Sequence, residues 1–434
     1  MIRITILPVI LLVILFVTGI FFLTRKKRWF KALGVLLIIV SLAGAIEGVY
    51  LYVHSMKALK AIANQTTEIT TYGIYVLEDA KIENVEGLEK KTVGFSKDVT
   101  TDDLSEALKE YTFKLSSYSS QLELIEGLKN EECVGAVLST SYINMLEDNE
   151  VDVGLGVELR LLEEISIEKV VENPVVVTPK EPFVVYISGK DTWGHISVPS
   201  RSDVNILAAV NPETKHILLV STPRDYYVPL SIAGGAMDKL THTGIYGIDV
   251  SEETMENLYG IDIDHYFKVN FSGFEGLINA MGGITVWSDY EFDVENIGHF
   301  SKGENHLMGL PALAFARERY SFPRGDLVRG ENQMNVIQSV VQKMTSKSVL
   351  KNYGNILKEC DGTFATDFSS GEIADFVAFQ LSNPGEWKIE KLSVGGTGAH
   401  SSVYSLGKRA YVMYPNEEDI NNARERIQEV LDEE

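Results

Sequence analysis

Cysteine is almost absent from this sequence, which has only Cys133 and Cys360 in 434 residues. The two lie far apart, and neither belongs to a CxxC or Cys/His spacing, so a zinc site is not expected. A single disulfide between them in an oxidising compartment stays open as an alternative.

Positive charge is also scarce, since 39 lysines and arginines stand against 61 aspartates and glutamates, for a formal net charge of -22. A general nucleic-acid-binding protein needs a basic face to displace counterions, so no nucleic-acid partner is expected. The sequence lacks a GxxxxGK[ST] loop as well, so a phosphate site in this chain need not be a nucleoside triphosphate site. The overall composition is that of a globular protein, and the length allows two or three domains.

Two long apolar runs stand at the N-terminus, at residues 4–23 and 32–53, and only Glu47 interrupts the second. Each is long enough to span a bilayer as a helix. Residues 24–31 between them carry five positive charges, and the positive-inside rule places such a loop in the cytoplasm. We therefore expect a transmembrane hairpin over residues 1–53 in the cell membrane, with the rest of the chain on the extracellular face. The alternative is an uncleaved leader followed by a signal peptide.

The segment after the hairpin predicts a polar helical stalk at residues 54–67 and a small α/β accessory domain at residues 68–173. TYGIYVL and CVGAVLS are typical of strands, and DDLSEALKEY has an acidic cap and the apolar spacing of a helix. No cluster of catalytic residues is visible there, so a spacer or docking role is expected. A proline-punctuated linker at residues 174–181 follows.

Residues 182–434 predict a second, larger α/β domain. FVVYISG, VNILAAVN and HILLVSTP are apolar runs typical of strands buried on both faces. FSGFEGLINAMGG has the spacing of a helix and a glycine stop, ITVWS indicates another strand, and LVRGENQMNVIQSVVQKMTS indicates a long amphipathic helix. KRAYVMYP and the acidic segment after it predict an edge strand and a terminal helix. Alternating strands and helices indicate an α/β/α layered sheet.

Charged residues stand at the ends of the three predicted strands. Asp191 follows the first strand, Arg201 and Asp203 directly precede the second, and Arg224 and Asp225 follow the third. Ligands of open α/β sheets bind outside the carboxyl ends of strands. These side chains are therefore candidates for one shared site, to which the motif DKLTHTGIYG adds Lys239.

The stretch ALAFARERYSFPRGDLVRGENQ carries four arginines in an acidic protein: Arg317, Arg319, Arg324 and Arg329. Arg329 and Gln333 are four apart and share a helix face beside the apolar stripe. Arg317 and Arg319 are two apart, so they converge only where a helix ends and the chain turns, as SFPRG predicts. The alternative is a solvated basic patch that Glu318 and Asp326 neutralise.

This mixture of arginines and carboxylates suits a phosphorylated ligand. Arginine forks match phosphate oxygens two at a time. Aspartates beside a phosphate would repel it unless a cation lay between them, and Mg²⁺ takes one or two carboxylates together with phosphate oxygens. A pyrophosphate carried by a membrane lipid would fit a site outside the cell better than a nucleotide.

Three motifs in the same order resemble the LytR–CpsA–Psr family of cell-wall proteins: SRSDVNILAAVNPETKHILLVSTPRDYYVP, DKLTHTGIYG and ALAFARERYSFPRGDLVRGENQ. The two spans and the smaller domain look like the capsule-associated CpsA branch. The resemblance implies a phosphotransferase that moves a glycopolymer, such as a capsular polysaccharide or a teichoic acid, from undecaprenyl pyrophosphate to peptidoglycan. The product would be a phosphodiester, typically at a muramic acid 6-hydroxyl. Capsule assembly proteins are a further partner that this branch suggests.

The resemblance also implies roles for individual residues. Asp191 and Asp203 look like Mg²⁺ ligands, and Asp203 or Asp225 would accept the proton of the attacking hydroxyl. Arg224 and Arg317 would act on the reacting phosphate together with these aspartates. The pyrophosphate ligands would be Arg201, Arg224, Lys239, Arg317, Arg319, Arg329 and Gln333. The family's GRxxxQ piece is RGENQ here, with Val328 in place of the helix-start glycine.

Family members hold the prenyl chain in an apolar tunnel, and FSGFEGLINAMGG would form one wall, although ordinary core packing explains its spacing as well. Two other functions use the same residues. One is hydrolysis of the lipid pyrophosphate with water as the acceptor. The other is a non-enzymatic, lipid-binding regulator of capsule assembly.

Overall fold

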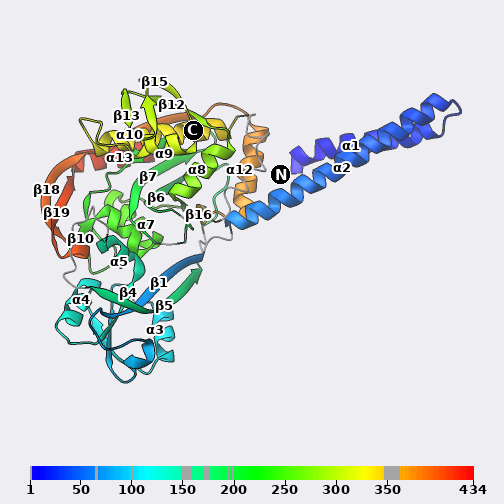
Figure 1. The fold of residues 1–434 in the computed structure, drawn as a ribbon. Helices are drawn as coiled ribbons and strands as arrows, with labels where there is room; N and C mark the ends of the chain where they lie inside the picture. The colour runs from blue at the N-terminus through cyan, green and yellow to red at the C-terminus, as the bar shows by residue number, and fades with distance from the viewer. Residues whose placement is uncertain are drawn as a thin grey trace.

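The computed structural model describes residues 2–63, 67–99, 101–147, 158–170, 175–193, 195–197, 199–346, 362 and 364–434. Two helices, α1 (Ile2–Leu23) and α2 (Arg28–Ala63), lie side by side and project from the rest of the chain as a long rod (Figure 1). They approach closely where glycines face each other, because a Cβ on Gly34 would lie 2.6 Å from the carbonyl oxygen of Gly19.

Among the described residues, one helix, Arg28–Val49, has the length and apolar composition to cross a membrane, and Ile10–Leu23 is a shorter apolar stretch. The predicted stalk is not a separate element, since α2 continues without a break to Ala63. The helical hairpin is thus observed as a fold, while its two membrane spans remain a prediction.

A five-stranded sheet follows, in the order β3-β2-β4-β1-β5. The predicted strands TYGIYVL and CVGAVLS lie in β1 and β4, and the predicted helix DDLSEALKEY begins at the Thr101 cap, whose hydroxyl accepts from the backbone N–H of Leu104. The elements are β1 (Thr67–Leu77), β2 (Thr92–Ser96), α3 (Asp102–Ala107), β3 (Lys114–Tyr118), α4 (Gln121–Lys129), β4 (Gly135–Ser139), α5 (Thr140–Glu147) and β5 (Leu159–Val170).

The larger part of the chain is built on a six-stranded mixed sheet in the order β16-β11-β6-β7-β8-β17. Its strands are β6 (Phe183–Lys190), β7 (Ser202–Asn211), β8 (His216–Ser221), β11 (His265–Val269), β16 (Phe364–Thr366) and β17 (Lys388–Ser393). β7 runs antiparallel to both β6 and β8. The start of β7 therefore lies at the same edge of the sheet as the ends of β6 and β8, which is where the candidate site forms.

Helices cover both faces of this sheet. On one face, Tyr186, Leu207 and Leu218 pack with residues of α7 (Ile248–Tyr259) and α13 (Glu417–Leu431). On the other face, Val185 and Leu219 pack with residues of α10 (Asp326–Met344) and α12 (Ser370–Ser382). The predicted mixed α/β class is confirmed, and the middle strands are buried on both sides because helices lie above and below them.

The remaining strands form two-stranded ribbons outside the sheets. The segment KRAYVMYP is a strand but not an edge strand of the main sheet, since it pairs antiparallel with its neighbour in the chain while β17 occupies the edge next to β8. The ribbons are β9 (Tyr227–Pro229) with β10 (Met237–Lys239), β12 (Ile284–Ser288) with β15 (Gly303–Leu307), β13 (Phe292–Val294) with β14 (Gly298–Phe300), and β18 (Gly396–Val403) with β19 (Lys408–Pro415). The short helices are α6 (Thr243–Tyr246), α8 (Phe271–Ala280) and α9 (Gly309–Arg317).

The two sheets are joined through the ribbon β18–β19. The Tyr142 hydroxyl of α5 donates to the backbone oxygen of Ser405 over 2.7 Å, and the Tyr404 hydroxyl donates to Asp98 over 3.0 Å. Leu406 and Val412 belong to one apolar cluster with buried residues of α4 and α5. The smaller part of the chain therefore packs on the larger one through a shared core. Cys133 in this cluster is a buried free thiol, and Cys360 lies outside the described residues.

Candidate functional site

The edge formed by β6, β7 and β8 gathers the predicted charged residues. Asp191 directly follows β6, where a bulge at Gly189/Lys190 shifts the register with β7, and its backbone N–H donates to the carbonyl of Arg201 over 3.3 Å. β7 already begins at Ser202, so Asp203 lies inside the strand rather than before it. A bulge re-aims the side chains that follow it, and this one lies immediately before the first carboxylate.

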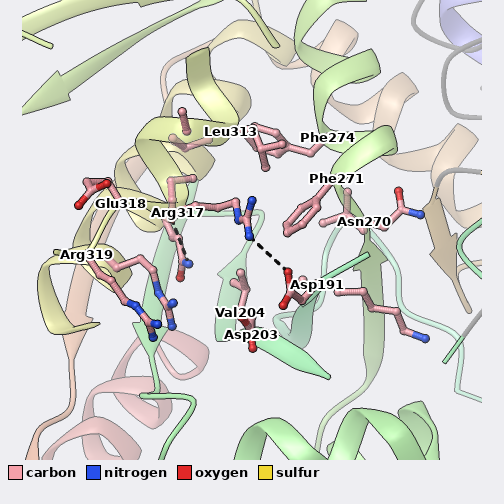
Figure 2. Close-up of a pocket in the computed structure, with 18 of the residues that line it drawn as sticks. Asp191, Asp203, Val204, Asn270, Phe271, Phe274, Leu313, Arg317, Glu318 and Arg319 are labelled. Atoms are coloured by element: carbon pink, nitrogen blue, oxygen red, sulfur yellow. Dashed lines mark hydrogen bonds and ion pairs between the residues drawn. The ribbon is translucent and has the colours of Figure 1, made fainter. Parts of the chain in front are cut away.

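A cavity of about 420 Å³ opens at this edge, between the sheet and the helices α8, α9 and α10. One end is polar, and the other is apolar. In Figure 2, Asp191 and Asp203 lie at one end and Phe274 and Leu313 at the other, with the Arg317 guanidinium between them. The charged and amide side chains of the lining are Lys190, Asp191, Asp203, Arg224, Asn270, Arg317, Glu318, Arg319, Arg329 and Gln333.

Asp203 is the most strongly held carboxylate of the polar end. Arg224 donates through Nη1 to Asp203 Oδ2 over 2.5 Å, and the Thr241 hydroxyl donates to Oδ1 over 2.9 Å. Burial acts to raise the pKa of Asp203, but the charges of Arg224, Arg329 and Arg201 outweigh burial and hold this pKa below its usual value. Asp203 therefore stays ionised at neutral pH.

Asp191 links the first strand to the arginine-rich stretch. Its carboxylate accepts from Arg201 Nη2 over 2.8 Å and lies 3.5 Å from Arg317 Nη2 (Figure 2). The Arg317 guanidinium also lies over the Phe271 ring, 4.2 Å from its centroid, a cation–π contact that fixes its direction. About half of the Arg317 side chain, 55%, is exposed, so this guanidinium has surface left for a ligand.

Arg317 and Arg319 converge on the cavity as the sequence predicted, because α9 ends at Arg317 and the chain turns there. Arg329 lies in the first turn of α10, is buried and forms an ion pair with Asp326. Gln333 lies one turn further and donates to the carbonyl of Ala316 over 3.3 Å. The two helices thus present their charged residues to the same volume.

Burial is the largest influence on the pKa values of Arg329 and Asp326, which form an ion pair. It lowers the pKa of Arg329 from its usual value, against the opposing attraction of Asp326, and it raises the pKa of Asp326, against the attraction of Arg329. The alternative of a solvated basic patch, in which Asp326 would neutralise arginines at the surface, does not fit, because the carboxylate of Asp326 is largely buried behind the cavity.

Val328, which stands where the family motif has glycine, fits the helix without disturbing it. It is buried inside α10, in a cluster with Phe315 and Phe322. The close approach of α10 to the sheet depends instead on Gly330, because a Cβ there would come within 2.4 Å of the Ser221 hydroxyl. A larger residue at this position of α10 would therefore require the Ser221 hydroxyl to turn away.

Three residues of the predicted set, Arg201, Asp225 and Lys239, do not line the cavity. Lys239 Nζ pairs with Asp225 Oδ1 over 3.0 Å, behind the turn that carries Arg224. Arg201 does not line the cavity itself but forms an ion pair with Asp191, which does. Arg324, which was not assigned to the site, points elsewhere and pairs with Glu331 over 2.8 Å.

The apolar end confirms that α8 contributes a cavity wall, through Phe271 and Phe274. α8 ends at Ala280, just before the predicted glycine stop. The other apolar lining residues are Ile187, Val204, Val269, Val294, Ile297, Leu310, Leu313, Ala314, Ala316, Val336 and Ile337. An elongated apolar wall behind a charged end suits an amphiphilic ligand.

The two carboxylates predicted to bind Mg²⁺ come from neighbouring strands and line the same cavity. Among the described residues, no group of three or more His, Cys, Asp or Glu side chains gathers to form a metal site. Two carboxylates nevertheless fit Mg²⁺, which completes its shell with water and phosphate oxygens. The donor set therefore fits a cation that binds together with a phosphorylated substrate.

Several residues at or next to the cavity were not predicted from the sequence. Lys190, Trp193, Asn270 and Tyr320 line it, and Thr241 and Asp326 hold its charged residues. Lys190 belongs to a strand and Trp193 to a loop, and nothing in their spacing signals a site. Two other residues near the motifs are buried and hydrogen-bonded away from the cavity: His242 bonds with buried Asp238 over 2.7 Å, and Tyr226 donates to the carbonyl of Gly395.

A model of the LytR_cpsA_psr family matches residues 160–428. The chain belongs to this family. The match is longer than the motifs alone indicated, since it begins in β5 of the smaller sheet and reaches α13. The first and third of the three motifs supply Asp203, Arg224, Arg317, Arg319, Arg329 and Gln333 to the cavity, whereas Asp191 lies before the first motif.

Curated relatives carry transferase names. The polyisoprenyl-teichoic acid–peptidoglycan teichoic acid transferase TagU of Enterococcus faecalis is 36% identical over 54% of this chain and 76% of its own length. TagU of Bacillus cereus is 35% identical over 46% of this chain and 65% of its own length. Among solved structures, protein gbs0355 of Streptococcus agalactiae is 25% identical and superposes with a TM-score of 0.51 over 58% of this chain and 89% of its own.

Proposed function

We propose that this protein is a membrane-anchored phosphotransferase that moves a glycopolymer from a polyprenyl pyrophosphate carrier to peptidoglycan. The observation that carries the proposal is a cavity whose charged end adjoins an apolar end. A polyprenyl pyrophosphate has the same two parts, and the names of the TagU relatives describe a polyisoprenyl-linked donor and a peptidoglycan acceptor.

The charged end would bind the diphosphate. Arg317 and Arg329 approach from α9 and α10, Arg319 from the loop after α9, and Arg224 from the loop after β8. Forked guanidinium groups neutralise charge on the bridging and terminal oxygens as it grows during phosphoryl transfer. Asp191 and Asp203 would hold Mg²⁺, which supplies further charge neutralisation at the diphosphate.

In the proposed reaction, an acceptor sugar hydroxyl attacks the phosphorus that carries the glycan. A new P–O bond to the acceptor forms, the bond to the bridging oxygen breaks, and polyprenyl phosphate leaves. The hydroxyl proton passes to Asp203, since Asp225, the other candidate, pairs with Lys239 and does not line the cavity. The low pKa of Asp203 makes it a weak base, so its larger contribution is to hold Arg224 in place.

The test uses the full-length protein in detergent with Mg²⁺, a prenyl-pyrophosphate-linked glycan and peptidoglycan oligomers, and follows the products by mass spectrometry. Glycan joined to peptidoglycan through one phosphate is the expected product, and chelation of the metal should abolish it. Free phosphoglycan as the only product would indicate a hydrolase. Bound lipid without turnover would indicate the non-enzymatic regulator, and either result would overturn the proposal.

The apolar wall gives a second prediction, with a matched control on the same segment. Leu310 lines the cavity and is 44% exposed, whereas Met308 is 43% exposed and does not line it. Leu310→Gln should weaken the binding of a long-chain prenyl pyrophosphate about tenfold, because about 1.5–3 kcal/mol accompanies full burial of a leucine side chain and this one is half-buried. Met308→Gln should have no effect.

Direct binding measurements with a long and a short prenyl chain check this prediction. The Leu310→Gln variant should bind the short-chain pyrophosphate as the unmodified protein does, because only the charged end holds that ligand. An equal loss for both chain lengths would show that Leu310 does not contact the lipid.

The membrane arrangement is part of the same proposal. Arg28–Val49 would span the bilayer, α1 would form a second span beside it, and the positive residues between the two helices would lie in the cytoplasm. The cavity would then lie on the extracellular face, where peptidoglycan is assembled. The undecaprenyl carrier and a capsular glycan as cargo are the specific donor that we propose.

A further inference from the structure

Two aromatic side chains at the cavity remain exposed to solvent. Trp193, in the loop after β6, is 54% exposed, and Tyr320, in the loop after α9, is 82% exposed, yet both contribute to the cavity lining. They therefore lie where the cavity opens to solvent. Binding of a diphosphate at the charged end gives neither of these rings a role.

Each ring is connected to an arginine of the site. Trp193 packs against Phe271 with ring centroids 5.5 Å apart, and Phe271 carries the Arg317 guanidinium over its face. Arg319 lies 4.7 Å from the centroid of Tyr320 and donates to its hydroxyl over 2.6 Å. Each exposed ring therefore adjoins one arginine of the charged end, either directly or through Phe271.

We propose that Trp193 and Tyr320 form a binding subsite for a pyranose ring of the substrate glycan. The inference rests on the proposed function and adds a sugar site to it. If the prenyl chain occupies the apolar end and the arginines hold the diphosphate, the sugar on the second phosphate must leave toward the opening. An acceptor hydroxyl that attacks this phosphate must approach from the same side.

The chemistry of the two partners matches. One face of a pyranose presents C–H groups, which pack against the negative face of an aromatic ring, while its hydroxyls project from the edge. Trp193 and Tyr320 offer such faces in water, and the Arg319 guanidinium beside Tyr320 offers donors to hydroxyls. Stacking of this kind tolerates different sugars, so the subsite would recognise a pyranose rather than one specific glycan.

The test compares Trp193→Ala and Tyr320→Ala with Trp287→Ala in the full-length protein. Trp287 is a matched control, since it is 53% exposed, lies on β12 and does not line the cavity. Binding is measured for a prenyl pyrophosphate without sugar and for the same lipid carrying a disaccharide. The two site variants should bind the glycan-linked lipid about three- to tenfold more weakly and the bare lipid normally.

The conservative variant Trp193→Phe should restore most of the loss, because it keeps an aromatic face. The KM values then identify the source of the sugar: a raised KM for the donor lipid places the donor glycan on the rings, and a raised KM for peptidoglycan alone places the acceptor there. Either outcome supports the subsite.

Equal losses for both lipids, or no difference from Trp287→Ala in both binding and the two KM values, would overturn the subsite while leaving the transferase proposal intact. An unmodified protein that binds neither lipid would instead overturn the proposed function, and the subsite with it.

Discussion

Replacement of Arg317 by alanine should lower the transfer rate by about 10²- to 10³-fold, as expected for the loss of one charged donor at a developing phosphoryl charge. The thermal unfolding temperature should stay the same. Arg317 is half-exposed and lies 3.5 Å from Asp191, so its removal leaves no buried charge without a partner. Asp191 keeps its closer contact with Arg201.

Arg324→Ala is the matched control for this experiment. Arg324 lies in the same stretch, is 51% exposed and forms an ion pair with Glu331, but it does not line the cavity. Its replacement should leave transfer unchanged. Arg317→Lys should recover only part of the activity, because an ammonium group cannot reproduce the two-pronged contact of a guanidinium. Full activity in Arg317→Ala would remove this residue from the reaction.

Replacement of Asp203 by asparagine should abolish transfer and also destabilise the fold. Arg224 and Arg329 are both buried, and the negative charge of Asp203 compensates them. Removal of one partner from a buried ion pair costs about 3–5 kcal/mol of unfolding free energy. Asparagine keeps the shape and the bond from Thr241, so the loss should reflect the charge. A thermal melt beside an activity assay separates the two effects.

The pH dependence of this stabilisation follows from the direction of the pKa shift. The pKa of Asp203 in the folded protein is below its ordinary value of 3.8, so the unfolded chain takes up a proton first as pH falls. The stabilisation is complete above pH 3.8 and disappears as pH falls through the lower folded-state pKa. The difference in stability between the unmodified protein and Asp203→Asn should therefore be constant from neutral pH down to about pH 4. A difference that shrinks already near pH 6 would contradict the ion-pair account.

The polar end of the cavity was largely predictable from the sequence, because its residues stand next to strand ends. Asp191, Asp203 and Arg224 meet since β7 runs antiparallel between β6 and β8. The spacing of Arg317 and Arg319 indicated a helix end, and α9 ends there. Strand adjacency and helix termini are local signals that a sequence carries well.

The residues that hold the charged side chains of the site in place were less predictable, because their contacts depend on tertiary neighbours. Lys239 shares a motif with the site, yet the ribbon β9–β10 directs it to Asp225 rather than into the cavity. Asp326 looks like an ordinary first-turn acid of α10, but burial makes it the partner of Arg329. The ribbons themselves also escaped prediction, since a strand pattern does not say which sheet the strand joins.

The long second helix of the hairpin has a mechanical consequence for the enzyme that we propose. α2 continues beyond its apolar stretch from residue 50 to residue 63, and at 1.5 Å per residue these residues form a shaft of about 20 Å. The shaft ends beside α12 (Figure 1), so in the proposed membrane arrangement it would set the height of the cavity above the bilayer. Each residue of a helix also rotates the chain by about 100° about the helix axis. The length of the shaft would therefore also set the orientation of the cavity opening about that axis. A lipid donor that keeps its tail in the bilayer would therefore reach the arginines of the cavity only if the shaft holds the opening at a suitable distance from the membrane and in a suitable orientation.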